Sequence, residues 1–433
     1  MTAGKPAVAL AVLALAAGVP ATAQERVVTL DEAIRLAERV QPGVVQAQAS
    51  LRNAEADVRS AWGAYLPSLN LGASGSESYS GAPARVDPIT NQVVSGRSNG
   101  SVATVLSASV DLFTGFRRGA QSRAARATSA AAAAGLVDAR YQQRLATTQQ
   151  FFDALAAAQL VRVRETSVRR AEEQLRQSIA KLQVGSATRS DTLRSRVSLG
   201  TAQVNLANAQ GDLAAAEAGL ARLIGAPGRV RAADDSSFYA AAPIDTTAIR
   251  AEALERSPQV QSARAAADAA RASVGAARAQ YWPTLSLSGS TGFDGTRAND
   301  YSLYNTSQVR LQLSWSLFDR FNREAQIVRS ESEADLADAQ AADRRLQVDA
   351  AVTAQLARLE AARTNIAITQ TSVAAAEEDL RVLQERYRVG LATILDVLTS
   401  QEALSQAEVD AVNARFDYLR AKAQLEAIVG HPL

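Results

Sequence analysis

The sequence predicts a mainly helical protein with a small β part, built from two tandem copies of the same arrangement. Long stretches without proline carry apolar residues at every seventh position, which is typical of coiled coils. Shorter stretches alternate apolar and polar residues, which favours half-buried strands. Segments of the first half also recur about 205 residues later in the second half. Each copy should therefore hold a long helical hairpin and a β-hairpin.

Three pairs of short motifs define the repeat. The matching stretches are 66–71 with 282–287, 112–116 with 317–321, and 224–227 with 429–432. These matches predict a first copy over residues 24–227 and a second copy over residues 245–433. Residues 228–244 would be the linker between them.

The first 23 residues have the pattern of a secretory signal peptide. Lys5 precedes an apolar run at 7–19, and small residues at 21–23 fit a cleavage site before Gln24. The chain has no cysteine, so we expect neither a disulfide nor an N-terminal lipidated cysteine. The formal net charge of +2 gives no reason to expect binding to nucleic acid.

Each copy is expected to open with a helix that a proline interrupts. Thr29 and Glu32 have the spacing of a capping box for the first helix. Pro42 and Pro258 occupy equivalent places and should break or kink the chain there. The helices that follow should continue to about residues 65 and 281.

Two much longer helices should follow the strands. Residues 117–184 and 322–389 contain no proline, and at 1.5 Å per residue each helix would span roughly 100 Å. In the second copy the seven-residue stripe consists of Val352, Leu359, Ile366, Val373, Leu380 and Tyr387, then Val397, Leu404, Ala411, Tyr418 and Leu425. In the first copy it consists of Val161, Val168, Leu175 and Leu182, then Leu199, Leu206, Leu213 and Leu220. These stripes predict left-handed coiled coils.

The alternating stretches predict one strand pair in each copy. In the second copy Val309, Leu311 and Leu313 alternate with Arg310 and Gln312. The same alternation at 106–112 predicts the corresponding strand of the first copy. The strand pairs should lie within about 66–113 and 282–318, with exposed loops at 78–101 and 294–306.

The two helical hairpins should turn at 184–193 and 389–398, which we call the first and second tips. Gly185 and Gly390 are placed to end a helix in the left-handed conformation. Thr188 with Asp191, and Thr393 with Asp396, have the spacing of capping boxes that begin the returning helices.

Four strands are too few to close a membrane-spanning barrel, because such barrels need at least eight. Open strand edges are costly in lipid, where unpaired backbone groups find no water. If these strands enter a membrane, several chains must share one barrel. Three chains would give twelve strands and also twelve helical columns, which could close into a cylinder continuous with the barrel.

The repeated order of helices and strands, the Leu-Pro and Trp-Pro motifs before the strands, and the Val-Gly…Thr…Asp tips resemble the TolC-like outer membrane factor family. The resemblance covers nearly all of the chain after the signal peptide. It implies a homotrimer with a 12-stranded β-barrel in the outer membrane of a Gram-negative-type cell, continuous with an α-helical tunnel in the periplasm. Linker 228–244 would contribute to an equatorial belt around that tunnel. The protein would be the passive exit duct of a tripartite efflux pump or a type I secretion system.

The resemblance also implies partners and site residues. The tips would contact a periplasmic adaptor, of the membrane fusion type, and through it an inner-membrane transporter. The residues in the docking positions are Val184, Gly185, Thr188, Asp191, Val389, Gly390, Thr393, Asp396, Val397 and Leu398. Asp191 and Asp396 would form a ring at the periplasmic gate. Ala392 and Thr399 replace an arginine and an acidic residue found in such tips, so the closure of this gate is left open.

No residue pattern predicts an enzyme. The chain has one histidine and no cysteine, so it offers no nucleophile or metal-ligand constellation, and we expect no cofactor and no metal. His431 should merely follow the last helix. The competing interpretation is a periplasmic coiled-coil adaptor, although such proteins usually have one hairpin. An outer membrane enzyme or adhesin is a third class, without a site to support it.

Overall fold

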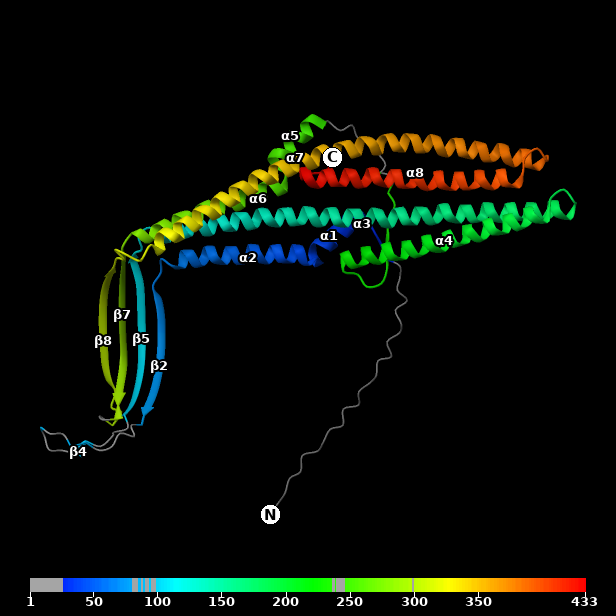
Figure 1. Ribbon diagram of the computed structural model, residues 1–433. Coiled ribbons are helices and arrows are strands. Elements are labelled where there is room, and N and C mark those ends of the chain that lie inside the picture. Colours follow the sequence, from blue (N-terminus) through cyan, green and yellow to red (C-terminus); the bar gives the residue numbers. More distant parts are fainter. Residues whose placement is uncertain are drawn as a thin grey trace, which may run out of the picture. The chain divides into compact units, whose positions relative to one another are not determined.

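The computed structural model describes residues 26–79, 85–86, 89, 93–94, 99–235, 238, 246–297 and 300–433. The predicted signal peptide at 1–23 and part of the predicted linker at 228–244 lie outside these residues. The predicted fold class is confirmed: the described chain is mainly helical, with a small sheet (Figure 1).

The helices follow the predicted order in both halves. The first half contains α1 (Leu30–Val40), α2 (Pro42–Gly63), α3 (Arg117–Gln183) and α4 (Arg189–Ile224). The second half contains α5 (Thr246–Arg256), α6 (Pro258–Arg278), the 3-10 helix η2 (Ala279–Tyr281), α7 (Asn322–Arg388) and α8 (Ile394–Val429). As predicted, Pro42 and Pro258 stand at helix starts, where a missing N–H leaves no hydrogen bond unmade.

The hairpin helices of the two halves have the same lengths and the same spacing. Helices α3 and α7 have 67 residues each, and α4 and α8 have 36 each. Helix α7 begins 205 residues after α3, and α8 begins 205 residues after α4. Subtracting 205 from a residue number in α7 or α8 therefore gives its counterpart in α3 or α4.

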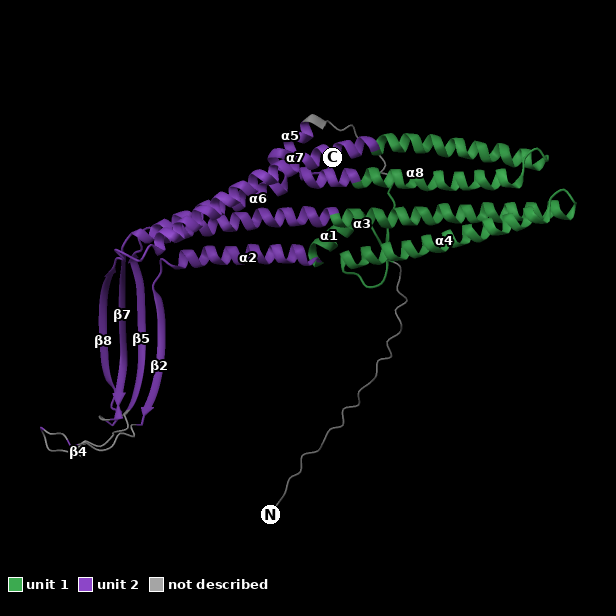
Figure 2. Ribbon diagram, viewed as in Figure 1, with its two compact units in different colours: residues 1–40, 146–240, 362–420 green, residues 41–145, 241–361, 421–433 purple. Residues whose placement is uncertain are grey.

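The chain divides into two compact units, each with segments from both halves (Figure 2). Unit 1 comprises residues 1–40, 146–240 and 362–420, and it contains both tips. Unit 2 comprises residues 41–145, 241–361 and 421–433, and it contains the main sheet.

Unit 2 contains a four-stranded antiparallel sheet. Its strands are β2 (Ser68–Ser78), β5 (Asn99–Phe113), β7 (Thr284–Thr296) and β8 (Tyr304–Ser314). They lie side by side in the order β2-β5-β7-β8 (Figure 1). The two predicted strand pairs are thus joined by β5 and β7, and within the described residues β2 and β8 each pair on one side only.

The register gives this sheet one apolar face and one polar face. Opposed residues share a face, so the pairs define each face across all four strands. The pairs on the apolar face include Leu69–Ala108, Leu71–Leu106, Val110–Leu287, Leu287–Leu311 and Leu285–Leu313. The pairs on the polar face include Ser68–Ser109, Asn70–Ser107, Ser109–Ser288, Ser288–Arg310 and Ser286–Gln312. Leu71, Leu311 and Leu313 are all exposed in the single chain.

One irregularity corrects the predicted alternation of the first-half strand. The register shifts between Asp111 and Phe113, so Phe113 rather than Leu112 stands opposite Leu285. A bulge of this kind adds one residue to one strand and moves the next side chain to the other face. The period-two pattern therefore holds only as far as Asp111.

Two short sheets were not predicted. The expected loop at 78–101 contains β3 (Arg85–Val86), which pairs with β4 (Val93–Val94). In unit 1, β1 (Arg26–Val28) pairs in parallel with β6 (Val230–Ala232), so the expected linker begins with a strand. Two- and three-residue strands leave no alternation long enough to detect in a sequence.

The capping box predicted for α1 is only half formed. The Thr29 hydroxyl accepts the Glu32 N–H at 3.3 Å. The Glu32 carboxylate instead pairs with Arg26 at 2.6 Å, because β1 brings this cation within reach. No helix in the described part of the chain is long and apolar enough to cross a membrane.

The residues of the seven-residue stripes are buried to different extents in the two halves. In the second half the positions Val352, Leu359, Leu380, Tyr387, Val397, Leu404, Tyr418 and Leu425 are all buried. In the first half Val161 and Leu220 are buried, but Leu175 and Leu199 are only half-buried and Leu182 is exposed. The most buried positions around the first tip are instead Ala171, Gln174, Ser178, Ser195 and Ala202.

Candidate functional site

The predicted site lies at the two hairpin tips, and the backbone of both turns is as expected. Gly185 has φ +76° and Gly390 has φ +81°, so both occupy the left-handed region. At the first tip the N–H of Ser186 donates to the Lys181 carbonyl at 2.8 Å, and that of Gly185 donates to Leu182 at 3.0 Å. This pair of bonds is the Schellman arrangement, which satisfies carbonyls left free at a helix end.

The second tip repeats this turn. The N–H of Leu391 donates to the Arg386 carbonyl at 2.8 Å, and that of Gly390 donates to Tyr387 at 3.2 Å. A Cβ atom at Gly185 or Gly390 would meet nothing within 4 Å. The glycines are therefore required by the positive φ and not by close packing.

Both predicted capping boxes are present. At the first tip the Thr188 N–H donates to the Asp191 carboxylate at 2.9 Å, and the Asp191 N–H donates to the Thr188 hydroxyl at 3.2 Å. At the second tip the corresponding bonds of Thr393 and Asp396 measure 2.8 and 3.3 Å. These bonds satisfy N–H groups that would otherwise have no partner at the helix start.

The carboxylate of Asp396 makes one bond more. The Thr393 hydroxyl also donates to it at 2.8 Å. The backbone and side-chain hydrogen bonds from Thr393 lower the pKa of Asp396 below its ordinary value. Asp396 therefore stays charged at the solvent-exposed start of α8, near the positive end of the helix dipole.

The second tip covers an apolar cluster. Its buried members are Leu380, Tyr387, Ile394, Val397 and Leu404, and Val373, Ala376, Leu383, Ala392 and Leu398 pack against them. Val397 is 0 % exposed. The structure therefore places Val397 in the core of the tip, where it supports the turn but cannot touch a docked protein. Leu398 is half-buried at the edge of the same cluster.

The first tip covers a more polar interior. The hydroxyls of Ser178 on α3 and Ser195 on α4 lie 2.8 Å apart in a fully buried contact. Among the described residues, the buried Thr192 hydroxyl and Gln174 amide nitrogen have no hydrogen-bond partner. Because an unpaired buried polar group is costly, this interior is less stabilising than the apolar one.

Lys181 connects the two tips. Its ammonium group donates to the carbonyl of Tyr387, lies 3.4 Å from the carbonyl of Arg388, and sits 3.9 Å from the centre of the Tyr387 ring. The last carbonyls of α7 carry the negative end of its dipole, so a cation is stabilising there. The aromatic face attracts the same charge.

Several apolar residues are exposed at the tips. Some of them were predicted from the sequence and others were not. Val184 is 78 % exposed and Val389 is 63 % exposed, in agreement with an external role for these predicted residues. Leu391 and Leu395 are also exposed at the second tip, and Leu193 is exposed at the first. Their place just before or after a helix start could have drawn attention to them. The docking role of all these residues stays a prediction.

The role of Asp191 and Asp396 as a ring at the periplasmic gate stays a prediction. One chain brings Asp191 and Asp396 to separate tips, so a ring requires several chains. Ala392 packs against the apolar cluster, and the Thr399 hydroxyl donates to the Leu395 carbonyl at 2.9 Å. Neither of these residues supplies a charge at the tip.

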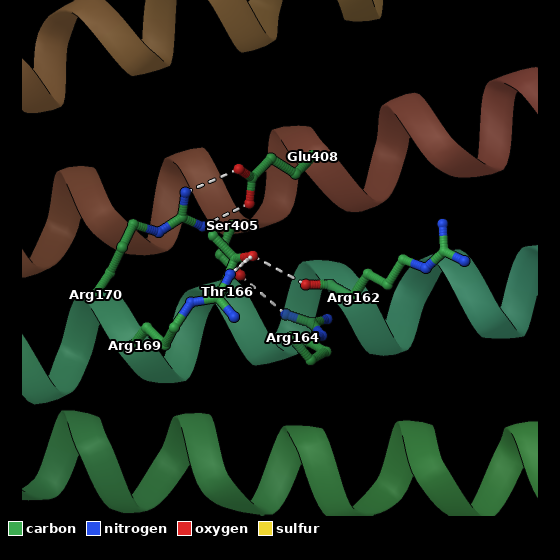
Figure 3. Close-up of polar contacts among 7 residues, drawn as sticks. All are labelled: Arg162, Arg164, Thr166, Arg169, Arg170, Ser405 and Glu408. Atoms are coloured by element: carbon green, nitrogen blue, oxygen red, sulfur yellow. Dashed lines mark hydrogen bonds and ion pairs between the residues drawn. The ribbon is translucent and has the colours of Figure 1, made fainter.

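Away from the tips, polar side chains join α3 to α8, at what we call the α3–α8 interface. Arg170 on α3 makes two bonds to the Glu408 carboxylate on α8, at 2.8 and 2.5 Å (Figure 3). Arg164 donates to the Ser405 hydroxyl at 3.0 Å, and Arg420 pairs with Asp153 at 2.6 Å. The side chains of Arg170 and Glu408 are only 22 % and 17 % exposed, so this two-pronged pair is better shielded than surface ion pairs.

No arrangement in the described residues indicates a metal ion: they contain no group of three or more His, Cys, Asp or Glu side chains suited to one. His431 lies 3.1 Å from the Glu252 carboxylate. Its hydrogen bonds to the Pro432 carbonyl and to Glu252 raise its pKa. The contact connects the end of the chain to α5.

Comparison with known proteins matches both halves of the chain. Residues 21–226 and 249–431 match the family described as outer membrane efflux protein. The chain is 27 % identical over 286 residues to the outer membrane efflux protein BepC of Brucella suis, covering 64 % of this chain and 62 % of BepC. It is 28 % identical over 302 residues to the alkaline protease secretion protein AprF of Pseudomonas aeruginosa, covering 65 % of this chain and 60 % of AprF.

The matched region thus spans about three-fifths of the length of these relatives. Among solved structures, the outer membrane protein VceC of Vibrio cholerae has a similar fold. The TM-score is 0.75 at 21 % identity, over 93 % of this chain and 96 % of VceC. Because the family match includes both helical hairpins and all four strands of the main sheet, the chain belongs to the outer membrane efflux protein family.

Proposed function

We propose that three copies of this chain form an exit duct in the outer membrane. The observation that carries this proposal is the open four-stranded sheet. Its apolar face extends over all four strands, and within the described residues β2 and β8 each have one unpaired edge. Three such sheets joined edge to edge would make a closed barrel of twelve strands with its apolar face toward lipid.

The duct is passive, and its energy comes from an inner-membrane transporter. The tips contact a periplasmic adaptor through the exposed residues around Val184, Gly185, Val389 and Gly390. The names of two relatives support a role in export, since BepC is named for efflux and AprF for protease secretion. Either a tripartite efflux pump or a type I secretion system fits the chain. The adaptor alternative finds no support in the family match.

The aspartates at the tips give the periplasmic end a cation preference. Three copies bring together six carboxylates, from Asp191 and Asp396, and acidic rings favour cations over anions. Residues 1–23 direct the chain through the inner membrane and are removed, so N-terminal sequencing of the mature protein should begin at Gln24.

The test of this function uses two neighbouring residues on opposite faces of β8. Leu313→Arg places a charge on the apolar face one residue before the end of β8, where it costs less than the roughly 2–4 kcal/mol of a site at the bilayer centre. Gln312→Arg, the matched control, places the same charge on the polar face. We expect Leu313→Arg to reduce the trimer recovered from outer membranes and Gln312→Arg to leave it unchanged.

The mass of the detergent-solubilised protein gives an independent readout. We expect a trimer. A folded, membrane-inserted monomer would disprove the shared barrel. Equal tolerance of arginine at 312 and 313 would instead overturn the assignment of the lipid-facing side.

A further inference from the structure

Arg310 is the only cation on the four strands of the main sheet. The sequences of β2, β5, β7 and β8 contain no lysine and no other arginine, and their only acidic residues are Glu77, Asp111 and Asp294. Arg310 belongs to the polar face of the sheet, because it stands opposite Ser288 in the pairing of β7 with β8. In the proposed barrel this face lines the lumen, so each copy contributes one positive charge to the wall.

Within the described chain, no acidic group neutralises this charge. The Arg310 side chain is exposed and forms no ion pair with a described residue. Asp111 lies two strands away, in the row of Gln312, and the spacing of strands and residues puts its Cα roughly 12 Å from that of Arg310. Asp294 lies opposite Tyr304, roughly 20 Å along β8. Both distances exceed the Debye length of about 8 Å at physiological ionic strength.

The next copy adds no acidic group beside Arg310. In the shared barrel β8 of one copy pairs with β2 of the next, because these are the two open edges of the sheet. Every second residue of β2, from Ser68 to Ser78, lies on the polar face, and these residues are serine, asparagine or glycine. The guanidinium of Arg310 therefore has a neutral wall on both sides.

The internal repeat shows that strand pairing does not require a charge at this position. The offset of 205 residues that relates 317–321 to 112–116 gives Val105 on β5 as the counterpart of Arg310. Val105 also lies on the polar face, between Gly72 and Gly292, and is 38 % exposed. The first hairpin thus forms with a neutral side chain at this place, so the arginine of the second hairpin calls for another reason.

We propose that the three Arg310 side chains of a trimer form an anion-binding ring inside the barrel, and that this ring favours substrates with a carboxylate or phosphate group. The proposal rests on the proposed trimeric duct and adds its substrate class. Rings of arginine are suited to anion and phosphate pores. A guanidinium binds two oxygens of a carboxylate or phosphate through two parallel N–H donors. The hydroxyls of Ser286, Ser288 and Ser290 belong to the same face and can donate further hydrogen bonds.

This ring has the opposite sign to the aspartates of the tips. Two charged rings in series both affect the ion preference of a duct, and each can be removed by substitution without the other. A molecule with a negative group is concentrated near Arg310, whereas a neutral molecule gains nothing from it. The ring therefore predicts a preference that the tips alone would not give.

The first experiment measures this preference. The natural protein and its variants are compared in planar bilayers under a gradient of potassium chloride, and the reversal potential gives the ratio of chloride to potassium permeability. We expect this ratio to fall in Arg310→Gln and to be kept in Arg310→Lys, which retains the charge. Val105→Arg adds the same charge at the counterpart position of the first hairpin and should raise the ratio.

The second experiment measures binding with inorganic pyrophosphate as the probe. Pyrophosphate should reduce the current through the natural protein, and the concentration for half block should rise several-fold in Arg310→Gln. Arg310→Lys should lie between the two, because an ammonium group lacks the planar pair of donors. Spermine, a cation, is the matched control probe. Its block should weaken in Asp396→Asn and should not weaken in Arg310→Gln.

A double variant separates the charge from the particular residue. Arg310→Gln/Gln308→Arg moves the arginine two residues along β8, to the place opposite Ser290 on the same face. We expect it to recover the chloride preference and the pyrophosphate block of the natural protein. Failure of this variant to recover either property in an intact trimer would contradict a lumen ring.

These outcomes separate the inference from the function on which it rests. A folded, membrane-inserted monomer would defeat both. An intact Arg310→Gln trimer with unchanged chloride preference and unchanged pyrophosphate block would overturn only the ring. If Arg310→Gln did not assemble, Val105→Arg in the otherwise natural chain would decide, because an unchanged permeability ratio there would show that charge at this place in the lumen does not select anions.

Discussion

At the first tip the side chains beneath the turn are small or polar, whereas at the second they are large and apolar. The backbone turns are alike, because each has a left-handed glycine and a Thr–Asp capping box. The interiors differ at matching positions: exposed Leu182, exposed Arg189 and half-buried Thr192 correspond to buried Tyr387, Ile394 and Val397.

This comparison separates what makes a turn from what stabilises it. Glycine and a capping box suffice for the backbone path, because their hydrogen bonds lie within the turn itself. The side chains below then decide the local stability. We expect the second tip to be rigid and the first to open more readily, since buried apolar contacts raise the free energy of local opening.

The largest effect should come from emptying the interior of the second tip. Leu404→Ala removes a buried side chain from the apolar cluster and should destabilise it by about 2–5 kcal/mol. Leu199→Ala is the matched change at the first tip, where the side chain is only half-buried, and should cost much less. Hydrogen exchange of the amides near residues 390 and 185 measures both. If both variants lost the same protection against amide exchange, the two tips would not differ in stability as we infer.

A smaller effect should come from straining the turns. Gly390→Val and Gly185→Val force a β-branched residue into the left-handed region, which costs about 1–2 kcal/mol or more. Asparagine tolerates this region, so Gly390→Asn and Gly185→Asn are the controls. We expect valine at 390 to impair export while trimer abundance stays normal. Normal export by Gly390→Val would contradict the proposal that the second tip is part of the docking site.

The contact of Lys181 with the end of α7 should contribute less to stability than the turns do. Lys181→Met keeps the length of the side chain but removes its charge from the end of α7, which should cost about 1 kcal/mol. The counterpart change, Arg386→Met, removes a cation whose 3.5 Å bond to the Leu391 carbonyl is exposed, and should cost less. Amide exchange at the end of α7 reports both. An effect of Lys181→Met no larger than that of Arg386→Met would show that the contact between the tips does not stabilise the end of α7.

The smallest effect concerns pH at the second tip. Because folding lowers the pKa of Asp396, its stabilising contribution is complete above the ordinary aspartate pKa and is lost as the pH falls through the lower folded value. Acid should therefore increase amide exchange at the start of α8. Asp396→Asn should abolish this pH dependence and weaken cation preference, with little loss of trimer. If acid increased amide exchange equally in Asp396→Asn, the pH dependence would arise from another titrating group.

The sequence alone determined most of the helical architecture. Pro42 and Pro258 mark helix starts, and Gly185 and Gly390 mark helix ends, because the signals for these boundaries lie within a few residues of them. The 205-residue offset predicted equal hairpins in the two halves, and the helix lengths agree with it.

Only the tertiary structure decided which surfaces meet. The bulge after Asp111, the burial of Val397 and the pairing of β1 with β6 each depend on residues from another strand or helix. The Arg170–Glu408 pair joins positions 238 residues apart. Periodicity fixes which face of a helix is apolar, but not which partner covers that face. That choice follows from packing and charge between segments that are remote in the sequence.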